Sequence, residues 1–188
     1  MRKGLIRAAL PLLVLTGWST VPASAQADLL KDCFKATAVA GNAERIVAVC
    51  SDALSSGQYE TPGQKSLLLN NRSIGYVRQG DPDKALADLD EAIRVNPRDP
   101  YAFDNRGDIW REKKDYDRAL AEYAAALKAD PTFISAYYNR GLAFEGKGDP
   151  KSARAEYQAA VKMKGKDRPL DKQAKNKAQD RLNAIGKQ

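Results

Sequence analysis

The chain repeats itself every 34 residues, and this period constrains the fold more than any other feature of the sequence. The dipeptide Asn-Arg stands at 71–72, 105–106 and 139–140. A fixed period of this length indicates a stack of similar supersecondary units, because one unit cannot bury its apolar face alone. Further positions coincide when the chain is shifted by 34 residues: Gly80, Lys114 and Gly148, each followed by aspartate; Ala85, Ala119 and Ala153; Leu89, Tyr123 and Tyr157; Ala92, Ala126 and Ala160.

Each repeat unit has the pattern of two helices joined by a tight turn. In the middle copy, Gly107 and Trp110 share one face of the first helix, and Ala119 and Tyr123 share one face of the second. Small residues on these faces let the two helices approach closely, and the aromatic rings fill the space beside them. Pro131 then interrupts the chain and opens the next unit. The sequence therefore predicts an all-α protein built from helical hairpins.

These positions resemble the tetratricopeptide repeat, whose pattern is an aromatic residue, Leu-Gly, Tyr, Ala, a second aromatic residue and Pro. The resemblance covers about residues 66–167. The chain departs from the pattern by Arg in place of Leu, by Leu69 and Ser73 in the first copy, and by Gly165 in place of the last Pro. The three copies run through Leu69, Arg72-Ser73, Tyr76, Ala85, Leu89 and Pro97; through Phe103, Arg106-Gly107, Trp110, Ala119, Tyr123 and Pro131; and through Tyr137, Arg140-Gly141, Phe144, Ala153, Tyr157 and Gly165.

The resemblance implies a right-handed superhelical solenoid of antiparallel helix pairs with a C-terminal capping helix. In the last segment Leu170, Ala174, Ala178, Leu182 and Ile185 make one apolar stripe, as a cap requires. The expected organisation is a divergent N-terminal hairpin at 26–60, repeats at 61–99, 100–133 and 134–167, and a basic capping helix at 168–188.

The first 25 residues have the pattern of an export signal. The basic start MRKGLIR precedes the uncharged apolar run AALPLLVLTGW, and small residues follow in VPASAQA. The apolar run is too short for a membrane span of about 20 residues, although a membrane anchor is the alternative interpretation. We therefore expect cleavage near residue 25 or 27, no transmembrane span afterwards, and a periplasmic or secreted protein.

Export permits a disulfide between the two cysteines, Cys33 and Cys50. The turn signal Gly41-Asn42 lies midway between them, and residues equidistant from the turn of an antiparallel hairpin face each other. We expect a bridge that stabilises the fold by about 3 kcal/mol. The alternative is two unlinked cysteines in the core.

The arginine of each repeated dipeptide is predicted to form an ion pair inside its own unit. An acidic residue follows each arginine after 16 positions, and the midpoint falls on the turn, so the two side chains should face each other across the hairpin. The alternative is a basic stripe that binds anionic ligands. The predicted pairs are Arg72 with Asp88, Arg106 with Glu122, and Arg140 with Glu156.

The asparagine of the dipeptide lies off the packed face, so Asn71, Asn105 and Asn139 should project together from adjacent first helices. The resemblance implies that these helices line a concave groove and that this asparagine holds the backbone of an extended peptide, to which its amide offers a donor and an acceptor. The alternative is an asparagine that bonds only to neighbouring helices. The other expected groove residues are Arg78, Tyr101, Asp104, Asp108, Tyr138 and Leu142.

Acidic residues outnumber basic ones on this face, which favours a neutral or basic partner segment with an apolar anchor. Family members with a carboxylate clamp carry Lys and Arg on the first helix of their third unit. The matching places here hold Ser135 and Asn139, so a peptide C-terminus is not the expected ligand.

Composition argues against an enzyme. The chain has no histidine, which removes the usual general base and the commonest metal ligand, and it has no Gly-rich phosphate loop. No catalytic residue, cofactor or metal is expected. The net charge of +7 is a C-terminal feature, since residues 161–188 carry +6 and residues 26–160 carry −2.

The sequence thus favours an exported scaffold or adaptor that binds a protein or peptide in the groove of its repeats. The alternative is an envelope protein whose basic C-terminal helix binds an anionic surface of lipid, polysaccharide or nucleic acid. Nucleic acid is disfavoured because the basic segment lacks interleaved aromatic residues.

Overall fold

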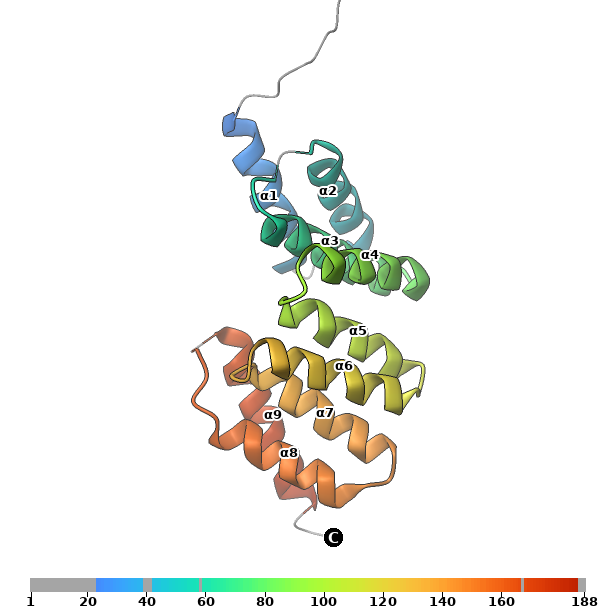
Figure 1. Ribbon diagram of the computed structural model, residues 1–188, viewed down its shortest axis with the longest axis vertical. Helices are drawn as coiled ribbons and strands as arrows, with labels where there is room; N and C mark the ends of the chain where they lie inside the picture. Colours follow the sequence, from blue (N-terminus) through green and yellow to red (C-terminus); the bar gives the residue numbers. More distant parts are fainter. Residues whose placement is uncertain (1–22, 39–41, 58, 167, 186–188) are drawn as a thin grey trace, which may run out of the picture.

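The computed structural model describes residues 23–38, 42–57, 59–166 and 168–185, with side chains from residue 29 onward. The predicted export signal lies outside this part of the chain, apart from its last residues. Within the described ranges there are nine α-helices and no strand, which confirms the predicted all-α fold (Figure 1). The helices are α1 (Ala23–Ala38), α2 (Ala43–Ser55), α3 (Pro62–Arg78), α4 (Pro82–Val95), α5 (Pro100–Glu112), α6 (Tyr116–Ala129), α7 (Ile134–Gly146), α8 (Pro150–Lys162) and α9 (Pro169–Ile185).

The repeated residue pair before each second helix makes the tight turn of the hairpin. The aspartate caps the helix, because its side chain accepts a hydrogen bond from a backbone N–H in the first helical turn. The residue before it takes a left-handed backbone conformation, with φ of 77° at Gly80, 61° at Lys114 and 78° at Gly148. The capping bonds run from Lys84 to Asp81 at α4, from Arg118 to Asp115 at α6, and from Ser152 to Asp149 at α8.

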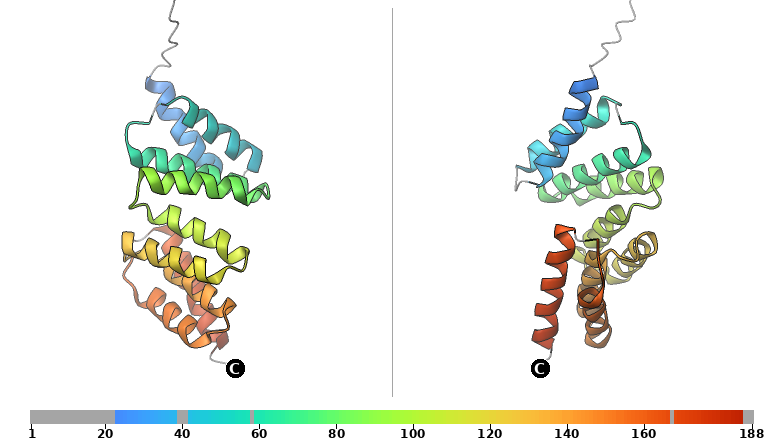
Figure 2. Two further views of the ribbon diagram at one scale, coloured as in Figure 1. Left: turned by 45° about the vertical axis from the view of Figure 1, so that its right-hand side comes forward. Right: turned by 90° about the vertical axis from the view of Figure 1, so that its left-hand side faces the viewer.

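The helix pairs stack in chain order from one end of the molecule to the other (Figures 1 and 2). The first helices α3, α5 and α7 contact one another in sequence, whereas the second helices α4, α6 and α8 contact no other second helix. The array therefore curves with its first helices on the inner side. This surface is the concave face that the sequence led us to expect.

We number the hairpins by their repeats: α3–α4 is the first, α5–α6 the second and α7–α8 the third. Close packing inside the second and third hairpins depends on a glycine that faces a tyrosine. A Cβ atom at Gly107 would lie 2.7 Å from a ring carbon of Tyr123, and one at Gly141 would lie 2.8 Å from a ring carbon of Tyr157. Both rings are fully buried. The first hairpin differs, because it has Ser73 where the others have glycine and the fully buried Leu89 where they have tyrosine.

The N-terminal hairpin is cross-linked as predicted. Cys33 of α1 and Cys50 of α2 form a disulfide, with their Cα atoms 4.8 Å apart. Both are fully buried in a cluster with Ile46 of α2 and Leu68 of α3. The bridge therefore lies in the core that joins this hairpin to the repeats.

The C-terminal helix α9 packs against both α7 and α8 and runs alongside the last hairpin (Figure 2). Ala174 and Ala178 are buried in its contact with the last hairpin. The prediction that Leu170 belongs to this apolar stripe is wrong, since Leu170 is exposed and the neighbouring Asp171 is buried. Asp171 tolerates burial because Arg168 donates a hydrogen bond of 2.8 Å to it.

Along the described part of the chain, none of the helices has the length and the apolar character that crossing a membrane requires.

Candidate functional site

The three predicted ion pairs are present, so the repeated arginines hold their own hairpins together. Arg72 bonds Asp88 through two nitrogens, at 2.8 and 2.7 Å. The arginines are about one-fifth exposed, and their carboxylate partners are less exposed still. These side chains therefore do not form a free basic stripe on the inner surface. The two other pairs, Arg106 with Glu122 and Arg140 with Glu156, have nitrogen–oxygen distances of 2.8 Å.

Two of these arginines also connect their unit to the one before it. The remaining nitrogen of Arg72 donates to the Ser51 hydroxyl of α2 at 3.2 Å. Likewise, Arg106 reaches Asp90 of α4 at 2.7 Å. The arginine thus ties a hairpin internally and fixes its position against its neighbour.

The repeated asparagines bond to the preceding first helix. The side-chain amide of Asn105 donates to Asn70 Oδ1 at 2.8 Å, and that of Asn139 donates to both oxygens of Asp104 at 3.2 Å. Each acceptor lies 35 residues earlier in the chain. This spacing is the signal in the sequence that could have revealed these bonds.

Asn71 has no such partner, because the residue 35 positions earlier is Ala36, which lacks a polar side chain. Asn71 is only 5% exposed, and in the described part of the chain its Nδ2 makes no hydrogen bond. The expectation that Asn71 and Asp104 are exposed to a ligand has to be corrected, since both are buried between helices. Asn105 and Asn139 remain partly exposed.

Asp104 and Asp108 form an acidic pair one turn apart on α5. The hydroxyl of Tyr123 donates to Asp108 at 2.8 Å, and Arg111 donates to the same oxygen at 3.1 Å. Burial and the neighbouring Asp108 raise the pKa of Asp104 well above its usual range, and the hydrogen bond from Asn139 only partly opposes this. Burial and the charge of Asp108 also raise the pKa of Tyr123.

The remaining predicted groove residues of the second and third units serve packing. The ring of Tyr101 meets that of Phe133 edge-on, with centroids 4.9 Å apart. Tyr138 and Leu142 are partly buried against the cluster that α9 completes, and Lys177 of α9 lies over the Tyr138 ring at 6.0 Å. The capping helix thus takes up much of the third unit's inner face, which leaves the first and second units as the more open part of the groove.

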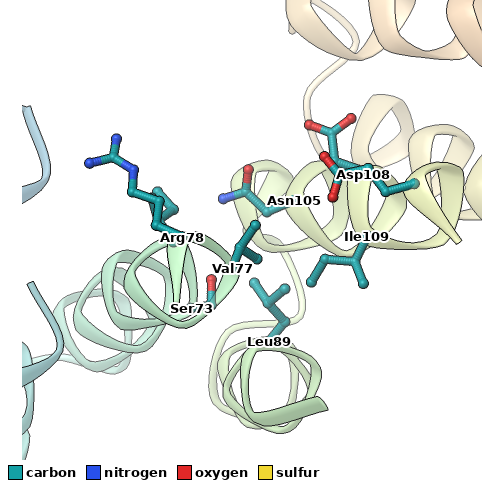
Figure 3. Close-up of a pocket in the computed structure, with 9 residues that line it drawn as sticks. Ser73, Val77, Arg78, Leu89, Asn105, Asp108 and Ile109 are labelled. Carbon is teal, nitrogen blue, oxygen red and sulfur yellow. The ribbon is translucent and has the colours of Figure 1, made fainter. Parts of the chain in front are cut away.

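A pocket of about 180 Å³ lies in that open part, between α3 and α5 (Figure 3). Leu89 rises into it from α4, and Ile109 and Val77 contribute apolar side chains from either side. Asn105 and Asp108 lie on the side opposite Leu89 (Figure 3). The pocket therefore has an apolar floor and a polar rim, and it faces the inner surface. Its full lining is Ser73, Ile74, Val77, Arg78, Leu89, Asn105, Asp108, Ile109 and Glu112.

The pocket exists because the first hairpin departs from the repeat pattern. In the other two hairpins a tyrosine ring fills the space above a glycine. Ser73 does not leave room for such a ring, and Leu89 is too short to fill the same volume. The sequence shows Leu69 and Ser73 as departures from the repeat pattern. That Ser73 and Leu89 together leave a pocket is visible only in the packed structure.

The basic C-terminal segment uses part of its charge internally. Arg168 and Lys166 bond to Asp130, at 3.2 and 3.0 Å. Arg181 forms an ion pair with Glu145. Within the described residues, these three basic side chains are therefore paired with acidic residues of the second and third repeats. The positive charge available to an anionic partner is correspondingly smaller.

The arrangement defines a class of helical repeat protein whose inner surface is lined by the first helix of each hairpin. A tetratricopeptide-repeat family model matches residues 71–132, and a second model of the same repeat matches residues 134–167. Together they cover more than half of the chain, so the protein belongs to the tetratricopeptide repeat family. A search of curated proteins found no sequence match.

Solved structures with the same fold include MamA, which is 19% identical with a TM-score of 0.58, covering 73% of this chain and 75% of MamA. The second tetratricopeptide domain of human RPAP3, solved in complex with the HSP70 peptide SGPTIEEVD, is 18% identical with a TM-score of 0.57, covering 68% of this chain and 99% of that domain. YrrB, described as a tetratricopeptide protein with an unusual peptide-binding site, is 25% identical with a TM-score of 0.53, covering 71% of this chain and 66% of YrrB.

Proposed function

We propose that this protein is an exported adaptor that binds an extended segment of another protein along its inner surface and catalyses no reaction. The observation that carries the proposal is the pocket between α3 and α5, which combines an apolar floor with the partly exposed amide of Asn105. Ligand sites in proteins are commonly concave and apolar, with a few polar groups that set the orientation of the ligand.

The amide of Asn105 is suited to a peptide backbone. One of its N–H groups is taken by Asn70, and this bond fixes the plane of the amide. Within the described residues its oxygen accepts no hydrogen bond, so an acceptor and a second N–H remain for a partner. Peptide complexes and peptide-binding sites are named for two of the proteins with this fold, human RPAP3 and YrrB, which is consistent with the proposal.

Site-specific photo-crosslinking in the producing cells tests the proposal. A photoreactive residue replaces the exposed Arg78 at the pocket rim, and a matched variant carries it in place of the exposed Lys128 on the second helix α6. We expect a discrete adduct from position 78 and none from position 128. Equal adducts from both positions, or none from position 78, would show that the inner surface is not a binding face.

Export is tested separately by sequencing the N-terminus of the protein recovered from those cells. A mature chain that begins at Gln26 or Asp28 is expected. Recovery of the protein with its first 25 residues intact, in the fraction that contains the cytoplasmic proteins, would contradict export.

A further inference from the structure

The pocket between α3 and α5 has the size and surface of a site for one aliphatic side chain. Its volume of about 180 Å³ is similar to the ~150 Å³ of an apolar protein cavity that binds benzene. Leu89 is fully buried and Ile109 is 3% exposed, so the floor is already desolvated. A branched aliphatic side chain that enters gains contacts there without displacing any hydrogen-bonded group of the floor.

The rim carries opposite charges on its two sides. Arg78 is exposed on α3, and Glu112 is exposed on α5. Within the described residues neither makes an ion pair, whereas Asp108 on the same rim is already bonded to Arg111 and Tyr123. A chain that crosses from α3 to α5 passes Arg78, then the pocket, then Glu112.

This inference rests on the proposed function. We propose that the pocket is the anchor site for the partner, and that the partner is an extended peptide segment with one aliphatic residue between an acidic and a basic residue. A single Leu, Ile or Val enters the pocket. An acidic residue on one side of it pairs with Arg78, and a basic residue on the other side pairs with Glu112. The asparagine at the rim, Asn105, holds the backbone next to the anchor.

The rest of the repeat array shows how to close the pocket without breaking the hairpin. The third hairpin has Gly141 under the Tyr157 ring and an aliphatic residue, Leu142, next to that glycine. Ser73→Gly together with Leu89→Tyr reproduces this arrangement beside Ile74, the residue that corresponds to Leu142. The double variant therefore fills the hollow with a ring that the same fold accommodates elsewhere.

The test uses a random library of linear peptides displayed on phage and selected on the full-length protein. We expect enrichment of peptides with one aliphatic residue between an acidic and a basic residue. The filled variant, Ser73→Gly with Leu89→Tyr, should bind the enriched peptides roughly tenfold or more weakly, which is the factor that burial of one aliphatic side chain supplies. Its thermal unfolding should match or exceed that of the parent protein.

A charge-exchange variant tests the rim. Arg78→Glu with Glu112→Lys changes two exposed side chains and leaves the floor intact. Selection on this variant should enrich peptides in which the order of the acidic and basic residues around the aliphatic residue is reversed along the chain. Unchanged peptides would overturn the assignment of the two charges.

The outcomes separate this inference from the proposed function. Peptides that bind the parent and the filled variant equally would show that the groove binds but that its anchor site lies elsewhere. If no peptide is enriched above a control protein without repeats, the proposed function fails, and the anchor site fails with it. Should the filled variant not fold, Val77→Phe obstructs the same pocket from a partly exposed position and is expected to weaken binding likewise.

Discussion

Removal of the disulfide should destabilise one end of the molecule by an amount that follows from the loop it closes. Cys33 and Cys50 are 17 residues apart. Cross-linking a loop of that length lowers the entropy of the unfolded chain by about 10.5 cal/mol/K, which corresponds to about 3.1 kcal/mol at 25 °C. Reduction of the parent protein isolates this effect, because the buried sulfur atoms stay in place. Replacement of both cysteines by alanine adds the loss of two buried sulfur atoms, and should cost somewhat more.

Urea unfolding of the oxidised and the reduced protein measures the loss of unfolding free energy. Amide hydrogen exchange shows which helices are destabilised. Because each unit of a repeat array contacts only its neighbours, amides of α1 and α2 should lose protection first while those of α8 and α9 keep theirs. An unfolding free energy that changes by less than about 1 kcal/mol on reduction would refute the loop-closure reasoning. Equal loss of protection at both ends would instead refute the modular behaviour of the array.

Three substitutions test the contacts between and within the repeats. Arg106→Ala leaves the mostly buried Glu122 without its partner and should lower the free energy of unfolding by roughly 2–3 kcal/mol. This is the cost of breaking a buried ion pair, reduced because the pair is partly exposed. The loss of thermal stability should be larger than any loss of binding affinity. Gly141→Ala places a Cβ atom 2.8 Å from a ring carbon of the buried Tyr157, and should cost about 1–3 kcal/mol in urea unfolding. Asp104→Asn removes a carboxyl whose pKa is raised in the folded state by burial and by the neighbouring Asp108. Such a carboxyl stabilises the fold fully only below its pKa in the unfolded chain, and this stabilisation is lost as the pH rises through the folded pKa. The variant should therefore melt at a higher temperature than the parent protein at pH 7, and the difference should disappear towards about pH 4.

Matched variants give these predictions their controls. Arg94→Ala removes an exposed arginine and should change the free energy of unfolding by less than about 1 kcal/mol. An equal loss for Arg94→Ala and Arg106→Ala would contradict a stabilising role for the Arg106–Glu122 ion pair. Gly63→Ala meets nothing closer than 3.8 Å and should be neutral or stabilising, and a loss as large as that at Gly141 would argue against the ring contact. A gain from Asp104→Asn that stays the same at every pH would show that the carboxyl is not the source of the cost.

The features that the sequence determined by itself are those that a single hairpin decides. In an antiparallel pair of helices, the turn position specifies which residues face each other. Cys33 and Cys50 therefore form the predicted disulfide, and each repeated arginine bonds to the acidic residue 16 positions later. These contacts need only helical geometry and a known turn, both of which are local properties of the chain.

Contacts between hairpins required the tertiary structure. The burial of Asn71 and Asp104 depends on how closely adjacent first helices approach, and the packing of Tyr138 depends on α9, which lies further along the chain beyond the whole of α8. The pocket between α3 and α5 depends on the volume left between a short Leu89 and the neighbouring unit. Periodicity in a sequence specifies which faces are buried, but the space left between stacked units is set by the side-chain sizes and inter-helix distances of two units together, and only the assembled array shows it.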